Sequence, residues 1–145
     1  MCGMDDAPRI QFDTKLAIVV ADDLPTWKKL NVASFLAGGL GGTFPELVGE
    51  VYRDADGSTY SPLMRQPVLI FAAARPALRQ VVDRARAREV RVGIYTEDLF
   101  RTGNDVDNRA AVAAVATADL DVVGIGIYAS KTLVDKLCKG LPLHP

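Results

Sequence analysis

The sequence predicts an α/β fold, and two observations carry this prediction. Apolar runs of strand length alternate with segments in which apolar residues recur every three or four positions, as they do in helices that cover a sheet. The chain has 145 residues, enough for one hydrophobic core, and no repeat or linker divides it. We therefore expect residues 1–145 to form a single domain, in which residues 1–14 are an extended or poorly ordered N-terminal segment.

The first strand is predicted at residues 16–21. A helix should follow Pro25, with Thr26 as its cap, because apolar residues then share one face at the spacing i, i+3, i+4, i+7: Ala33, Leu36, Ala37 and Leu40. Gly41 and Gly42 are expected to end this helix, since glycine is common just past a helix terminus.

Residues 50–60 predict a short β-hairpin inserted after that helix. Asp56 and Gly57 are placed in its turn, because glycine readily takes the positive φ that tight turns need. Asp54 and Asp56 also match the start of a calcium loop, but Arg65 stands where that loop needs its final glutamate. The hairpin is the preferred interpretation.

Three more strands are predicted in the rest of the chain, at residues 67–73, 91–96 and 121–128. Residues 67–73 are apolar on both faces, which favours a place in the middle of the sheet. Helices are expected to start at Pro76, to cover residues 106–116, and to run from a Ser130 cap to Gly140.

The composition argues against several partners. Lysine and arginine total 17 against 18 aspartates and glutamates, so a formal charge of −1 provides no positive field for nucleic acid or an anionic membrane. Charged residues interrupt every apolar run before the about 20 residues needed to span a bilayer. The first residues lack the pattern of a secretory signal, so we expect a cytoplasmic protein.

Residue types with well-defined chemistry are sparse, and no metal or cofactor is predicted. Cys2 and Cys138 lie near opposite ends, which gives neither metal-ligand spacing nor a disulfide framework. The lone histidine, His144, falls in a tail expected to be mobile, which argues against a catalytic triad. Gly124 and Gly126 lack the third glycine of a dinucleotide site and should instead permit close backbone approach.

Charged residues follow the first and third predicted strands, where open α/β sheets carry their chemistry. Asp23 comes after the first strand, and Asp98, Arg101 and Thr102 come after the third. If these strands are parallel neighbours, the groups share one edge, and a carboxylate beside a cation can orient water or a substrate hydroxyl. Helix capping by the aspartates is the alternative.

The start of the first helix supplies further candidates for this site. Lys28 and Lys29 would provide the cation, and Trp27 would form a wall of the cleft. The alternatives are solvated lysines in a first helical turn and a tryptophan that anchors the edge of the core.

These segments resemble the type 2 peptidyl-tRNA hydrolases over nearly the whole chain after about residue 14. The likeness rests on residues 15–24 before a helix of small residues, on residues 98–102, and on Gly124 to Gly126 before a helix. More closely, the chain is similar to an uncharacterised bacterial family that shares this fold, domain of unknown function 2000, at residues 23–36, 45–49 and 65–68. The resemblance implies a three-layer α/β/α domain with a mixed four-stranded sheet and an inserted hairpin.

The two hydrolase motifs carry over unequally. In the motif Asp-Ala-Gly-Arg-Thr, Leu99 and Phe100 replace the small pair, and the other positions match at Asp98, Arg101 and Thr102. In the motif Gly-Lys-Val-Ala-Ala-Gln, Leu30 stands at the catalytic lysine, whereas Lys29 takes the place of the glycine and Ser34 that of the glutamine. Moving a helical side chain by one residue rotates it by about 100°, so Lys29 does not automatically reach the same substrate atom.

Three functional hypotheses follow. The first is a diverged site that binds a small metabolite and, if it is an enzyme, hydrolyses an ester or amide bond in it. Its candidate catalytic residues are Asp98, Thr102 and Lys29, and its candidate ligand-binding residues are Asp23, Trp27, Lys28, Ser34 and Arg101. The second is a non-enzymatic binding or assembly module, such as a homodimer. The third is peptidyl-tRNA hydrolase activity.

Overall fold

The computed structural model describes residues 10–145, so Cys2 and most of the expected N-terminal segment, residues 1–14, lie outside it. Its main feature is a mixed four-stranded sheet in the order β4-β1-β6-β5. The central strand β1, Thr14–Ala21, runs parallel to β4, Val68–Ala73, and antiparallel to β6, Val122–Ser130. The last strand, β5, Val92–Thr96, is antiparallel to β6.

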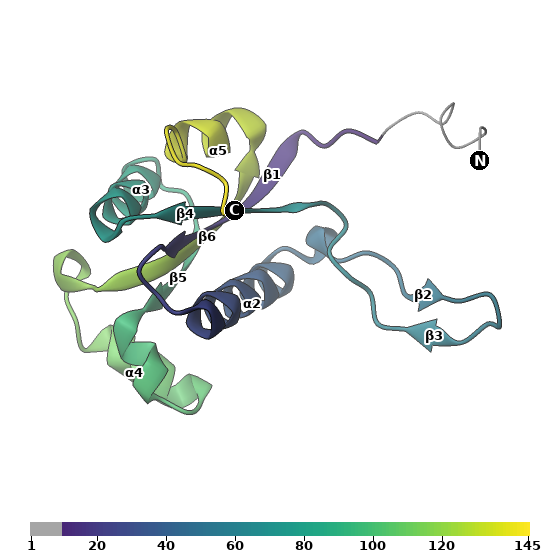
Figure 1. The fold of residues 1–145 in the computed structure, drawn as a ribbon, viewed down its shortest axis with the longest axis horizontal. Coiled ribbons are helices and arrows are strands. Elements are labelled where there is room, and N and C mark those ends of the chain that lie inside the picture. The colour runs from purple at the N-terminus through teal and green to yellow at the C-terminus, as the bar shows by residue number, and fades with distance from the viewer. Residues whose placement is uncertain (1–9) are drawn as a thin grey trace.

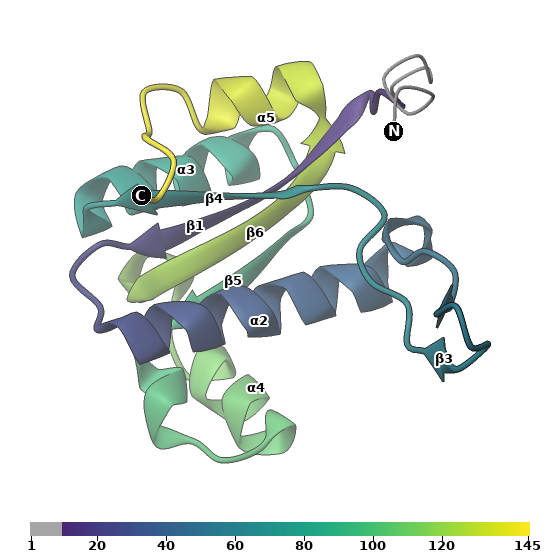
Figure 2. The same ribbon diagram turned by 45° about the vertical axis from the view of Figure 1, so that its right-hand side comes forward.

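Helices cover both faces of this sheet, so the expected α/β class and mixed four-stranded sheet are confirmed (Figure 1). One face carries the long helix α2, Thr26–Thr43, and the other carries α3, Arg75–Ala87, and α5, Lys131–Leu137. The remaining helix, α4, Asp105–Ala113, lies on the same side as α2, next to β5 (Figure 2). Short 3-10 helices are η1, Pro45–Leu47, η2, Glu97–Arg101, and η3, Thr117–Asp119.

The core lies on both sides of β1. Every residue from Leu16 to Ala21 is buried, because this strand has a neighbouring strand on each edge and helices on both faces. By contrast, α4 has no buried residue. No helix in residues 10–145 is long and apolar enough to cross a membrane.

Helix α2 does not end at its glycines as predicted, and it has no side-chain cap at Thr26. It continues to Thr43, where the N–H of Phe44 donates to Leu40 O at 2.8 Å before Pro45. Tertiary packing outweighs the low helix propensity of glycine here, because Leu40 is buried. A Cβ at Gly41 would also lie 3.2 Å from Met64 Cε, so a larger residue would crowd the Met64 side chain.

The prediction that residues 67–73 lie in the middle of the sheet is wrong. Strand β4 is at one end of the sheet, and the C-terminal segment covers its outer side. Ala72 N donates to Pro142 O at 3.3 Å, and His144 N donates to Ile70 O at 2.8 Å. The strand is apolar because helices cover both faces of the sheet, and the C-terminal segment satisfies its outer backbone groups. These bonds hold His144 in an ordered position where the sequence predicted a mobile tail.

The glycines of β6 do permit close approach, as expected. A Cβ at Gly126 would lie 3.0 Å from Leu40 Cδ1, and one at Gly124 would overlap Val32 Cγ1. Helix α2 therefore packs closer to the sheet here than it could against side-chain-bearing residues.

The hairpin is also confirmed. Its strands are β2, Tyr52–Arg53, and β3, Thr59–Tyr60, and Gly57 has a φ of 87° in the turn. Asp54 accepts hydrogen bonds from the N–H groups of Asp56 and Ser58, each at 3.0 Å. The hydroxyl of Tyr60 donates to the second carboxylate oxygen of Asp54, Oδ2, at 2.6 Å. The Asp54 carboxylate thus organises the turn.

Candidate functional site

The carboxyl ends of β1 and β5 lie at the same edge of the sheet, because both strands are antiparallel to β6. They are not neighbours, however, since β6 separates them. Arg75 connects this edge: its guanidinium lies 3.0 Å from Asp23, 3.2 Å from Glu97 and 3.3 Å from Asp121. Arg75 was not among the residues predicted from the sequence, because nothing in its local pattern indicates three partners from distant segments.

These contacts also set the protonation of Arg75. Burial lowers the pKa of its guanidinium, but the hydrogen bond that it donates to Asp23 and the charges of Asp23, Asp121 and Glu97 outweigh burial and raise the pKa overall. The partner of Asp23 is therefore Arg75.

Asp98 lies in η2, and its nearest cation is Arg101 in the same turn, at 2.8 Å. Both side chains are exposed, Asp98 to 44% and Arg101 to 73%. Lys28 approaches this turn, with its Nζ 4.4 Å from the centroid of the Phe100 ring. Lys29 points elsewhere, because its Nζ lies 3.2 Å from His144 Nε2 in the C-terminal segment. Helix α2 thus directs the two lysines to different partners.

The other predicted site residues fall into two groups. Ser34 is exposed and donates to Leu30 O at 2.8 Å within its own helix. Thr102 donates to Leu99 O at 3.0 Å and also contacts Asn108 Oδ1. Trp27 and Thr102 both line one cavity. Ser34 does not line this cavity or the larger one that adjoins it.

Aromatic side chains from three elements form a continuous wall near η2. Trp27 packs edge-on against Phe100 at a centroid distance of 6.3 Å, Phe100 packs on Tyr95 at 5.0 Å, and Tyr95 packs edge-on against Phe35 at 5.7 Å. Phe100 is one of the two residues that replace the small pair of the hydrolase motif. Burial raises the pKa of the Tyr95 phenol above its ordinary value.

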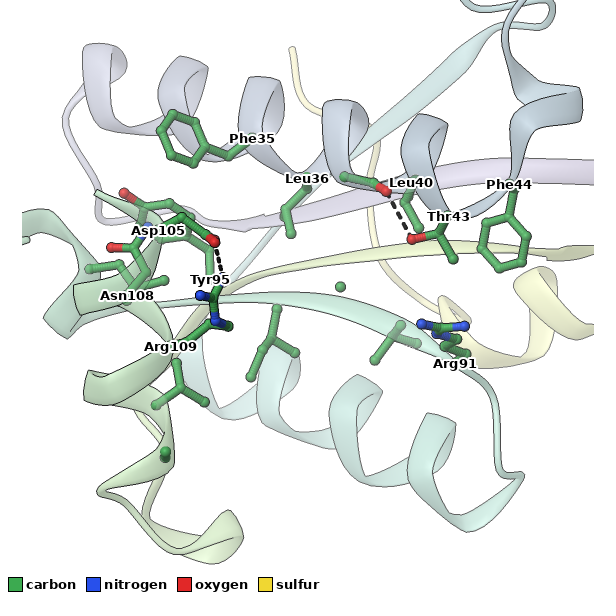
Figure 3. Close-up of a pocket in the computed structure, with 17 residues that line it drawn as sticks. Phe35, Leu36, Leu40, Thr43, Phe44, Arg91, Tyr95, Asp105, Asn108 and Arg109 are labelled. Atoms are coloured by element: carbon green, nitrogen blue, oxygen red, sulfur yellow. Dashed lines mark hydrogen bonds and ion pairs between the residues drawn. The ribbon is translucent and has the colours of Figure 1, made fainter. Parts of the chain in front are cut away.

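Two adjoining cavities lie along this wall. The η2 cavity, of about 460 Å³, is bounded by α2, β5, η2 and the start of α4, and it includes Trp27 and Thr102. The β5 cavity, of about 630 Å³, lies between α2, β5 and α4 (Figure 3). They share five lining residues, Phe35, Tyr95, Leu99, Asp105 and Asn108. Asp98, Lys28 and Lys29 line neither.

Gly39 opens the β5 cavity on the α2 side. Phe35, Gly39 and Thr43 are four residues apart and all line the cavity, so they share one face of the helix. A Cβ at position 39 would have no other atom within 4 Å. The i, i+4, i+8 spacing was visible in the sequence, but its meaning depends on α4, which leaves the space unfilled.

The polar residues of the β5 cavity stand at its two ends. Figure 3 shows Arg91 near Thr43 and Phe44, and Asp105, Asn108 and Arg109 at the opposite end. Asp105 and Arg109 form an ion pair one turn apart on α4. Arg91 is exposed, and its side chain has no hydrogen bond or ion pair within residues 10–145.

The architecture and cavities define an α/β protein with two adjoining cavities between the edge strand β5 and the helices α2 and α4. The chain belongs to the family described as "Protein of unknown function (DUF2000)", whose profile matches residues 14–145. It is similar to a solved structure from Agrobacterium tumefaciens str. C58, the protein of unknown function Atu0240, at 39% identity and a TM-score of 0.89. The match covers 93% of this chain and 100% of that one. No curated protein matches the sequence.

Proposed function

We propose that this protein binds a small molecule in the joined β5 and η2 cavities. The observation that carries the proposal is the β5 cavity of about 630 Å³ beside the aromatic wall. Ligand pockets commonly measure about 300–1,000 Å³ and combine mostly apolar walls with a few polar groups. Trp27 and Thr102, both named as candidates by their place in the sequence, border the adjoining space.

A pair of glycine substitutions tests this proposal. Gly39→Leu should place a side chain inside the β5 cavity, whereas Gly38→Leu is a matched control, because Gly38 lines neither cavity. Position 38, like position 39, has no other atom within 4 Å of an added Cβ. Leucine also favours the helix over glycine by up to about 1 kcal/mol, so both variants should fold.

The measurement is a thermal-shift screen with a metabolite library. Compounds that raise the melting temperature of wild type and Gly38→Leu should have little effect on Gly39→Leu. A ligand at 100 times its Kd adds about 2.7 kcal/mol of stability, which such a screen detects. Hits that stabilise all three proteins equally would place binding elsewhere.

Hydrolysis of an ester or amide bond is a second candidate, and the position of Lys28 favours it. Its Nζ lies over Phe100, in the turn that also holds Asp98 and Arg101. In this proposal Asp98 orients the attacking water, Thr102 and Arg101 hold the substrate, and Lys28 takes the role first expected of Lys29. The sheet arrangement and the Asp98-to-Thr102 motif also support a fold of the type 2 peptidyl-tRNA hydrolase kind.

Ester substrates and three variants test this second candidate. Asp98→Asn and Lys28→Ala should each reduce hydrolysis by about 100-fold or more, the typical contribution of a positioned acid–base group. Lys29→Ala is the matched control and should retain the wild-type rate. Equal release of peptide from peptidyl-tRNA by wild type and Asp98→Ala would exclude the peptidyl-tRNA reaction.

A non-enzymatic assembly role is the alternative, and the hairpin favours it. Tyr52, Tyr60, Val51 and Leu63 are each at least half exposed in or beside β2 and β3. If a second copy covers them, sedimentation should find a dimer at micromolar concentration that Leu63→Asp dissociates. A monomeric wild-type protein would refute the homodimer.

A further inference from the structure

The β5 cavity combines an apolar middle with a single uncompensated charge. Its middle is lined by aliphatic side chains from three elements: Leu36, Leu40, Val92, Ile94 and Val112. Gly39 leaves the α2 side open, and α4 buries none of its residues against the core. An apolar molecule placed here would therefore lose contact with water without displacing any packed side chain.

The two ends of this cavity differ in charge. At the α4 end, Arg109 is neutralised by Asp105, and the side-chain oxygen of Asn108 contacts Thr102. At the other end, Arg91 is exposed and has no partner in the part of the chain that the structure describes. A guanidinium presents paired N–H donors that match a carboxylate.

The distance between the ends sets the length of the ligand. Tyr95 follows Arg91 by four positions of extended chain, which corresponds to about 13 Å at about 3.3 Å per residue. One unpaired arginine matches one negative charge, whereas a phosphate monoester would bring almost two. The cavity thus favours a linear molecule with a single terminal anion.

We propose that the β5 cavity binds a medium-chain aliphatic carboxylate, with the carboxylate on Arg91 and the chain along β5 between α2 and α4. The inference rests on the small-molecule function proposed above and assigns its ligand class. The carboxylate accepts hydrogen bonds from the guanidinium, and the chain contacts Leu36 and Leu40 on α2 and Val112 on α4.

Octanoate and octan-1-ol test this inference, because they share the chain and differ in the charge of the head group. In isothermal titration calorimetry, wild type should bind octanoate about tenfold more tightly than octan-1-ol. This factor corresponds to the low end of the free energy contributed by hydrogen bonds to a charged group, as expected at an exposed site. Arg91→Gln should remove this preference by weakening octanoate alone. Arg86→Gln is the matched control, since Arg86 is exposed and lies outside the cavities.

The outcomes separate this inference from the more general proposal. Equal affinity for octanoate and octan-1-ol in wild type would overturn the assigned ligand class and leave small-molecule binding intact. Octanoate binding that survives Gly39→Leu, or an octanoate preference that survives Arg91→Gln, would also overturn it. If octanoate does not bind but the metabolite screen yields ligands blocked by Gly39→Leu, only the inference fails; if neither binds, both fail.

Discussion

Gly124→Ala tests whether glycine in β6 sets the distance between α2 and the sheet. The added Cβ would overlap Val32 Cγ1 and lie 3.2 Å from Leu36 Cδ1. Val32 is fully buried, and a β-branched side chain in a helix has one strongly preferred χ1 rotamer, so it cannot turn away from the new methyl group. Helix α2 must therefore move from the sheet.

Overpacking of this kind costs about 1–3 kcal/mol. In a protein of this size each kcal/mol lowers the melting temperature by about 3 °C, so Gly124→Ala should melt about 3–9 °C below wild type. Gly42→Ala is the matched control, because an added Cβ there meets no atom within 4 Å. It should be neutral or more stable by up to about 1 kcal/mol, since alanine favours the helix.

Urea unfolding of a double-mutant cycle isolates the clash. Val32→Ala alone removes two buried methyl groups and should cost about 2 kcal/mol. Combined with Gly124→Ala it also makes room for the new methyl, so the double variant should be at least about 1 kcal/mol more stable than the sum of the single effects. A Gly124→Ala protein as stable as wild type, or strictly additive effects, would refute the close-packing explanation.

Three further predictions concern charge and protonation. Arg75→Gln should lower the free energy of unfolding by about 1 kcal/mol, and by less in about 1 M salt, where charges are screened within about 3 Å; equal urea midpoints at low salt would contradict it. The Tyr60 hydroxyl is the largest cause that lowers the pKa of Asp54, so the ionised carboxylate stabilises the turn above its ordinary pKa of 3.8, and this effect is lost as pH falls through the lowered pKa. Tyr60→Phe should move that loss to higher pH in an NMR titration, and an unchanged Asp54 curve would exclude the bond. Burial raises the pKa of Cys138 to about 11, so in a Cys2→Ser background its thiol should react with a disulfide reagent only after unfolding, and rapid native labelling would show that it is accessible.

Local patterns predicted most of the secondary structure correctly. The apolar run of residues 16–21 falls within β1, and the predicted strand at residues 91–96 corresponds to β5. Ser130 caps α5, with its Oγ accepting from Leu133 N at 3.3 Å. These features depend on a few consecutive residues, so their signals are present in the sequence itself.

The errors arose where distant segments meet. Helix α2 passes through Gly41 because the packing of Leu40 and its neighbours compensates for glycine's low propensity. Strand β4 is apolar on both faces, yet it ends the sheet, and the C-terminal segment near His144 pairs with its outer edge. The sheet residues that pack on Leu40 and the C-terminal segment that pairs with β4 are both distant in sequence. The periodicity of the local sequence therefore carried no information about these contacts.

The sequence likewise predicted only part of the candidate site. From its residue types alone, the sequence determined that polar groups such as Asp98 and Thr102 follow β5 and that a lysine-bearing helix follows β1. Only the tertiary structure decided that Lys28 faces Phe100 while Lys29 faces His144, because one residue on a helix rotates a side chain by about 100°. It also decided where space remains, since a cavity is set by the packing of α2, β5 and α4 together.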